Sequence, residues 1–356
     1  MSIIATKLCA HRSSIFCCLL LAACCSLLSG CAGVQSAVDP AGPQAGSISG
    51  LWWLMLYTLS AVFVIVICFV LVAAFRRRRP LSGESADGPD TRPEAEQERR
   101  MSRTVIAGVA LTILILFVLL VSSYLTGRKI YSAGYSAQGA LMIEVTGHQW
   151  WWDVRYNDPS PSRMVTTANE IHIPVGRAVV FRLTSADVIH SFWIPNLHGK
   201  MDLIPGHYTN IWIKADRAGT YRGQCAEFCG YQHAHMAFTV VVEPEEQYRA
   251  WYESQLRSAP QPSTPQQARG QEVFLSSPCI MCHRVQGTDA GGRAGPDLTH
   301  IGTRPTLGAG TVENTRGNLA GWVIDPQKIK PGIRMPPNNL EPQDLQALLD
   351  YLQSLK

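Results

Sequence analysis

The stretch Cys225-Ala-Glu-Phe-Cys229-Gly-Tyr-Gln-His233-Ala-His235-Met236 places two thiols, an imidazole and a thioether within twelve residues. Soft sulfur ligands beside imidazole suit copper, and a weakly bonded Met is a common partner in such sites. A mononuclear blue-copper site uses one Cys, so the second thiol indicates two sulfur atoms that bridge two copper ions. The alternatives are a disulfide, which an oxidising compartment favours, and a structural zinc site, although zinc has no use for Met.

The sequence around this loop is typical of a β-sandwich. Between Leu141 and Glu243, short apolar runs are broken by Gly, Pro, Asp and Asn. Residues 179–184 and 209–214 alternate apolar and polar side chains, and residues 237–242 are β-branched and apolar. This pattern predicts an antiparallel β-sandwich. Loops at one end of such a sandwich can hold a metal rigidly, which benefits electron transfer because the ligands do not rearrange.

Three further segments extend the pattern: Gly147-His-Gln-Trp150-Trp-Trp-Asp153, Ser185-Ala-Asp-Val-Ile-His190-Ser-Phe-Trp-Ile-Pro195 and Lys200-Met-Asp-Leu-Ile-Pro-Gly206. Together with the cysteine loop they resemble subunit II of cytochrome c oxidase. The resemblance implies a cupredoxin fold for residues 133–256 and electron acceptance by Trp150. It also implies a dinuclear copper A centre held by His190, Cys225, the backbone carbonyl of Glu227, Cys229, His233 and Met236.

Two details of that site depend on weaker signals. The Glu227 side chain would, by the resemblance, reach a magnesium or manganese ion at the boundary with subunit I. On the residues alone, the first histidine ligand is open. His190 is preferred because it ends a turn after an alternating run, and His235 is expected to point away from the copper. The other candidates are His148, His172, His198 and His207.

The N-terminus resembles the leader of a bacterial lipoprotein. Lys7 and Arg12 precede the apolar run Ile15 to Leu28, which is followed by Ser-Gly-Cys31. The run is too short to span a bilayer but suits a signal-peptide core. We therefore expect residues 1–30 to be a signal peptide and Cys31 to carry lipid. An uncleaved anchor is the alternative.

Two longer apolar runs follow within residues 31–132. Residues 51–75 and 104–125 contain no charged side chain, and both exceed the ~20 residues that a membrane helix needs. Arginines at 76–79 and at 99, 100 and 103 flank the loop between them. The positive-inside rule therefore predicts a two-helix transmembrane hairpin in a bacterial inner membrane, with everything after Ser132 on the periplasmic side. Because these two helices contain no polar pathway of their own, the hairpin alone cannot act as a transporter.

The C-terminal part carries a second redox motif. Cys279-Ile-Met-Cys282-His283 has the spacing for covalent haem c attachment, with His283 as an iron ligand. A redox-active Cys-x-x-Cys is the alternative. Met335, in a proline-rich loop, is the only methionine that follows this motif in the sequence. It is therefore the expected second iron ligand, and His300 is its rival.

The remaining features of this part complete a small cytochrome. Gly295-Pro296 resembles the cytochrome segment whose proline carbonyl orients the iron-bound histidine. Leucines at 345, 348, 349, 352 and 355 predict a closing helix that packs on a helix near residues 271–275. We expect an all-α, class I cytochrome c domain at residues 270–356, joined to the sandwich by a Pro/Gln-rich linker at 257–269.

Composition agrees with a redox protein. The formal charge is +4, and no basic cluster is interleaved with aromatic residues, so nucleic acid is not indicated. The 11 cysteines divide into five in the leader, Cys31, Cys68 in the first apolar run, and four for copper and haem. That count leaves no pair for a structural disulfide.

The whole chain resembles subunit II with a fused cytochrome c, as in caa-type oxidases. The resemblance implies a non-catalytic-core subunit of cytochrome c oxidase that passes electrons from haem c to copper A and on to subunit I. Oxygen reduction there would be coupled to proton translocation, and the donor would be a cytochrome bc complex or a soluble cytochrome c. A copper A nitric oxide reductase subunit and a membrane-anchored electron carrier without an oxidase partner are the alternatives.

Overall fold

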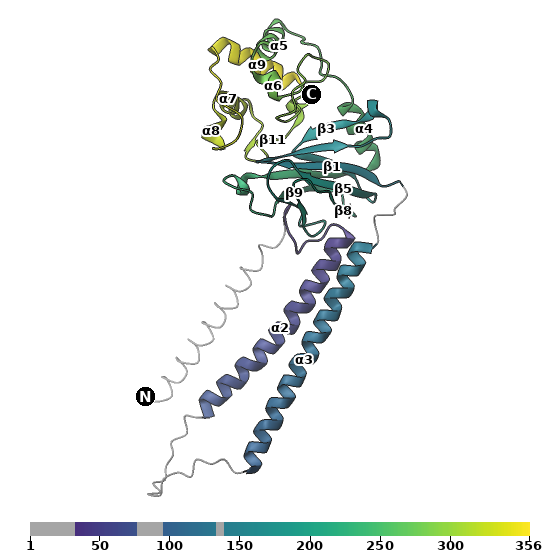
Figure 1. Ribbon diagram of the computed structural model, residues 1–356, viewed down its shortest axis with the longest axis vertical. Coiled ribbons are helices and arrows are strands. Elements are labelled where there is room, and N and C mark those ends of the chain that lie inside the picture. The colour runs from purple at the N-terminus through teal and green to yellow at the C-terminus, as the bar shows by residue number, and fades with distance from the viewer. Residues whose placement is uncertain (1–32, 77–94, 133–138) are drawn as a thin grey trace, which may run out of the picture. The chain divides into compact units, whose positions relative to one another are not determined.

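The computed structural model describes residues 33–76, 95–132 and 139–356 (Figure 1). It contains two compact units. One unit, Ser47–Ala133, holds the apolar helices, and the other holds the sandwich together with the C-terminal domain. The predicted signal peptide and Cys31 lie outside the described residues.

Two helices, α2 (Pro43–Arg76) and α3 (Ala95–Ser132), contain the predicted membrane segments and are long and apolar enough to cross a membrane. Both extend beyond the uncharged runs. In the first turns of α3, Glu96 lies 2.9 Å from Arg100 one turn later, and such a pair supports a helix end. Polar residues therefore continue a helix whose apolar part alone was evident from the sequence.

The middle of the chain is a sandwich of two five-stranded sheets (Figure 1). Their strand orders are β3-β2-β1-β5-β8 and β4-β10-β9-β6-β7. Of the eight strand pairings in these two sheets, six are antiparallel and two are parallel, β1 with β5 and β10 with β4. The purely antiparallel sandwich that we expected is therefore wrong for these two pairs, because the chain crosses between the sheets before returning. The strands are β1 (Leu141–His148), β2 (Trp151–Tyr156), β3 (Val165–Ala168), β4 (Glu170–Pro174), β5 (Ala178–Ser185), β6 (His190–Trp193), β7 (Met201–Leu203), β8 (Thr209–Lys214), β9 (Gly219–Cys225) and β10 (Ala237–Glu243).

Aromatic packing fixes the strands that carry the cysteine loop. Phe192 on β6 stacks on Phe238 on β10 with ring centroids 4.6 Å apart, and Trp152 meets Phe238 edge-on at 5.2 Å. All three side chains are buried. Aromatic pairs of this kind add stability beyond their buried area. They hold β6 and β9 at the centre of one sheet, where Phe192 is paired with Cys225.

The C-terminal domain is helical apart from one short hairpin. As predicted, its last helix packs on an earlier one: Leu348, Leu349 and Leu352 share a buried cluster with Val273 and Phe274. A Cβ at Gly270 would lie 2.0 Å from the carbonyl oxygen of Ala347, so only glycine allows this close approach. The elements are α4 (Glu245–Gln255), α5 (Pro265–Ser276), α6 (Cys279–Cys282), β11 (Thr306–Leu307), β12 (Val312–Glu313), α7 (Arg316–Ile324), α8 (Pro326–Ile329) and α9 (Pro342–Ser354), with single turns η2 (Pro161–Arg163), η3 (His233–His235) and η4 (Ile301–Thr303).

The linker predicted at 257–269 is too long. Helix α5 already begins at Pro265, because proline suits the first helical position and the Thr264 side chain accepts a hydrogen bond from the amide of Gln267. The preceding residues are also bound, since the amide of Ala259 donates to the carbonyl of Gln286 at 2.9 Å. The prolines and glutamines that indicated a free linker instead begin a helix and lie along the C-terminal domain.

Candidate metal centre and haem cavity

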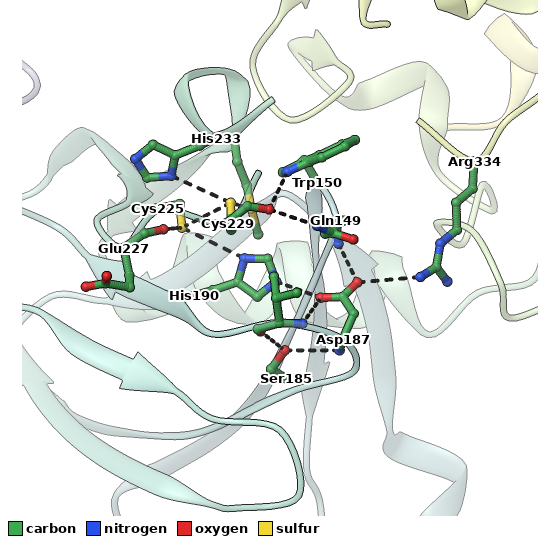
Figure 2. A network of polar contacts seen from close by, with 12 residues as sticks. Gln149, Trp150, Ser185, Asp187, His190, Cys225, Glu227, Cys229, His233 and Arg334 are labelled. Carbon is green, nitrogen blue, oxygen red and sulfur yellow. Dashed lines mark hydrogen bonds and ion pairs between the residues drawn. The ribbon is translucent and has the colours of Figure 1, made fainter. Parts of the chain in front are cut away.

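The two cysteines of the loop lie side by side at the end of β9. Their Sγ atoms are 3.8 Å apart, both side chains are buried, and neither forms a disulfide (Figure 2). The Nδ1 atom of His190 lies 3.9 Å from the sulfur of Cys225, and the Nδ1 atom of His233 lies 3.6 Å from that of Cys229. Each sulfur therefore has one imidazole beside it.

Two further donors complete the group. The thioether sulfur of Met236 is 3.8 Å from the sulfur of Cys229, and the carbonyl oxygen of Glu227 is 3.2 Å from the sulfur of Cys225. Figure 2 shows the Glu227 carboxylate directed away from the sulfur atoms, and this side chain is exposed. All six residues that the resemblance named are thus brought together. The donor set of two thiols, two imidazoles, a thioether and a carbonyl fits copper better than zinc or magnesium.

A carboxylate orients the buried histidine. The Nε2 atom of His190 lies 2.8 Å from Oδ1 of Asp187. The same carboxylate accepts hydrogen bonds from the amide of Gln149 at Oδ2 and from the amide of Val188 at Oδ1. Burial alone would lower the pKa of His190, but the bonds to Asp187 and Cys225 outweigh burial and raise it. Burial likewise opposes ionisation of Asp187, yet the bonds to His190 and the two amides lower its pKa. The pair therefore keeps Nδ1 directed at Cys225.

The two thiols titrate as one system. Contact with Cys229 and the hydrogen bond to His190 lower the pKa of Cys225. The pKa of Cys229 is raised in turn, because the hydrogen bond with Cys225, burial and the charge on Cys225 all disfavour a second thiolate. Deprotonated sulfur is the form that binds metal. A cation placed between the sulfurs would remove the repulsion, so the pair is suited to holding one.

The rival histidines lie away from the two cysteines of the loop. Among the described residues, only His190 and His233 contact a cysteine sulfur. His235 is bonded to the Oε1 atom of Gln232, as expected for a residue that points away. His148 stacks on Trp151, His172 lies between Glu170 and Glu243, His198 is largely buried, and His207 is exposed.

Trp150 is attached directly to the cysteine loop. Its indole Nε1 donates to the carbonyl of Cys229 at 3.0 Å, and the Gln149 side chain donates to the same oxygen at 2.9 Å. Only 8% of Trp150 is exposed. Sequence reasoning missed Gln149 and Asp187 as partners of the site. Asp187 carried a signal, since it stands three residues before His190.

The haem-attachment motif opens onto a cavity of about 420 Å³. Both motif cysteines, His283 and Met335 line it, together with apolar residues that include Phe274, Leu298, Leu348 and Leu352. The Nδ1 atom of His283 lies 2.8 Å from the carbonyl oxygen of Pro296, which confirms the predicted orienting contact. His300, the rival ligand, does not line this cavity. An apolar cavity with two thiols, an oriented imidazole and a thioether fits a haem c.

The cavity is closed partly by the sandwich. His148, Gln149, Trp150, Trp151 and Asn169 also line it. The fold and the two sites together define a class, a membrane-anchored cupredoxin-like domain joined to a cytochrome c-like domain.

Comparisons with known proteins agree with this class. Residues 158–243 match the family described as cytochrome c oxidase subunit II, periplasmic domain, and residues 267–356 match the cytochrome c family. Cytochrome c oxidase subunit 2 of Alkalihalophilus pseudofirmus is 35% identical over 92% of this chain and 94% of its own length. The Bacillus subtilis protein of the same name is 32% identical, over 95% and 97% of the two chains. The chain therefore belongs to the cytochrome c oxidase subunit II family, in the form that carries a C-terminal cytochrome c domain.

A solved structure is similar as well. The periplasmic domain of subunit II of cytochrome oxidase from Bradyrhizobium japonicum is 31% identical, with a TM-score of 0.32, and the match covers 33% of this chain and 95% of that one. Membership of the family implies a copper A centre in the sandwich and a haem c in the C-terminal domain.

Proposed function

We propose that this chain is the electron-accepting subunit of a respiratory terminal oxidase. Electrons would pass from haem c to copper A and on to subunit I, where oxygen is reduced to water with proton translocation. One observation carries the proposal: two buried thiols 3.8 Å apart, each beside its own imidazole, in the same compact unit as a haem cavity. Both groups supply reversible one-electron chemistry when bound.

The proposed copper ligands are the six residues gathered at the loop. The thiols would bridge two metal ions, and each ion would take one imidazole. Met236 and the carbonyl of Glu227 would complete the two coordination shells. The chain's own part is rigidity, because β6, β9 and the Asp187 bond hold the donors in place before metal binds.

In the C-terminal domain, Cys279 and Cys282 are proposed to bind the haem covalently, with His283 and Met335 as axial ligands. The bond from His283 to Pro296 supports this, because it fixes the imidazole ring and leaves Nε2 free for iron. His and Met ligation favours a high reduction potential. Trp150, which joins the cysteine loop to the haem cavity, is the proposed route between the two centres.

Three further proposals concern the surroundings of the protein. The exposed Glu227 carboxylate is suited to a magnesium or manganese ion at the boundary with subunit I. Arginines at the loop between the two apolar helices support a cytoplasmic loop and soluble domains on the periplasmic side. Cys31 would add a lipid anchor, and the electron donor would be a cytochrome bc complex or a soluble cytochrome c.

Metal analysis and spectroscopy of the purified complex test the proposal. We expect two copper ions and one haem c per chain and a mixed-valence copper signal in electron paramagnetic resonance. A blue-copper spectrum from a single copper would contradict it. Gas consumption separates the acceptors: turnover of nitric oxide without turnover of oxygen would assign the chain to a nitric oxide reductase. Isolation without any haem-bearing membrane subunit would favour a free electron carrier.

A further inference from the structure

A buried lysine joins the cytochrome domain to the sandwich. Lys330 follows α8, five residues before Met335, and only 1% of it is exposed. Its Nζ atom donates to three backbone carbonyl oxygens, those of Trp150 at 2.9 Å, His235 at 2.6 Å and Gly308 at 2.6 Å. Two of these oxygens belong to the sandwich and one belongs to the cytochrome domain.

This arrangement is a complete contact for an ammonium group. A lysine has three N–H donors, and here each has one acceptor. Among the described residues, no carboxylate forms an ion pair with Lys330, so the charge is held by carbonyl oxygens alone. Burial lowers the pKa of this amine to about 7, which reflects the cost of removing it from water. Burying an amine costs folding free energy unless each of its donors has an acceptor, and here the sandwich and the cytochrome domain together supply all three acceptors.

Three further contacts near Lys330 join the sandwich to the cytochrome domain. The side chain of Gln232 donates to the carbonyl of Pro331 at 2.8 Å, and the amide of Ala237 donates to the carbonyl of Ala309 at 3.0 Å. Arg334 lies 3.8 Å from Asp187, the carboxylate that orients His190 (Figure 2). The loop that carries Met335 is therefore bound to the sandwich through Lys330, Pro331 and Arg334.

The same loop covers Trp150. A Cβ at Gly332 would lie 3.7 Å from the Trp150 ring, so the glycine backbone is in contact range of the indole. Lys330 holds the carbonyl of Trp150 itself. This face of Trp150 is therefore occupied by the chain's own cytochrome domain.

We propose that Lys330 locks the cytochrome domain in one docked position, with the Met335 loop held over Trp150. The inference rests on the proposed function. In this arrangement the cytochrome domain does not move between an electron donor and the copper site. External donors deliver electrons to the haem, and the direct approach to Trp150 is closed. Lys330 acts as a positioning residue, since it touches the backbone around both centres and neither metal.

The test uses the purified oxidase complex with full-length chain. Lys330→Met removes the ammonium and keeps an unbranched side chain, and Lys328→Met is the matched control because Lys328 is 85% exposed two residues earlier. Each protein is also made with a flexible Gly/Ser insertion of about twelve residues between the exposed Arg257 and Ser258, long enough to relax any tether. Flash reduction of haem c then gives the rate of internal electron transfer to copper.

We expect the native and Lys328→Met rates to be unaffected by the insertion. In Lys330→Met the rate should fall on the order of tenfold or more, because the variant loses both hydrogen bonds from Nζ to the sandwich and the undocked domain then becomes the larger fraction. The insertion should lower it further, since the domain is then only tethered. Direct reduction of copper by a soluble ruthenium amine should become faster in this variant, and an unchanged haem c spectrum distinguishes undocking from misfolding of the domain.

Two results would overturn the proposal: a Lys330→Met rate equal to the native one with and without the insertion, or a native rate that falls when the insertion is present. If Lys330→Met fails to incorporate haem c, the insertion in the native chain alone decides between docking and tethering. Absence of the copper signal from the native complex would instead overturn the proposed function.

Discussion

Asp187 accepts a hydrogen bond from the ring of His190 at 2.8 Å, and the opposite ring nitrogen faces the sulfur of Cys225. The carboxylate thus fixes which nitrogen is available to a metal. Gln149 and Val188 donate their amides to the same carboxylate, so its position does not depend on the histidine.

Asp187→Asn should weaken copper binding by about 10- to 100-fold, the usual effect of removing a carboxylate partner from a metal-bound histidine. Competition with a copper chelator measures the change. Asp216→Asn is the matched control, because the Asp216 side chain is 52% exposed and forms a surface ion pair with Lys214 at 3.6 Å. Equal affinities in the two variants would show that the Asp187 contact does not orient a ligand.

Cys225→Ser should abolish the mixed-valence copper signal, because a hydroxyl cannot replace a bridging thiolate. Electron paramagnetic resonance and copper analysis of the purified complex measure this. Cys68→Ser, an exposed position in α2, should leave the signal intact. An unchanged signal in Cys225→Ser would exclude this sulfur from the centre.

Met335→Leu should remove the sulfur-to-iron charge-transfer band of oxidised haem c and lower its reduction potential, because the thioether ligand raises it. Optical redox titration gives both quantities. Met281→Leu is a close control, since Met281 stands inside the attachment motif but is 75% exposed. If the band survives in Met335→Leu, another residue binds the iron.

Acid should destabilise the sandwich through His198. Burial lowers the pKa of this histidine from 6.5 to about 4, so the folded state binds its proton less readily than the unfolded state. Neutral, buried His198 therefore contributes to the free energy of unfolding above pH 6.5, and this contribution is lost as the pH falls toward 4. It amounts to at most about 3 kcal/mol. His198→Gln should flatten the dependence of thermal unfolding on pH between these limits, with loss of the copper absorption as the readout. An identical dependence in both proteins would contradict this.

The sequence was most informative where the site is local. Cys225, Cys229, His233 and Met236 belong to one loop, so their spacing alone predicted a group of sulfur and imidazole donors. His190 was the preferred first histidine but stayed open on the residues alone, because it reaches Cys225 only through the pairing of β6 with β9. The strand pattern predicted a sandwich but not its two parallel pairs, since periodicity within a strand does not specify the neighbour.

Contacts between distant segments were out of reach. Lys330 bonds to residues 22, 95 and 180 positions away, and no local pattern marks such a lysine. The prediction of a linker up to residue 269 was wrong for a different reason. Proline is common both in extended linkers and at the first position of a helix, and at Pro265 the capping Thr264 decides for the helix.

The pairing of Phe192 with Cys225 also bears on how the protein is assembled in the cell. His190 on β6 and Cys225 on β9 are placed by this strand pairing and by the aromatic core behind it, so the sheet itself brings the two donors together without any contribution from a metal. The same closeness means that oxidation would join the two sulfurs, 3.8 Å apart, so metal loading requires that both thiols are still reduced.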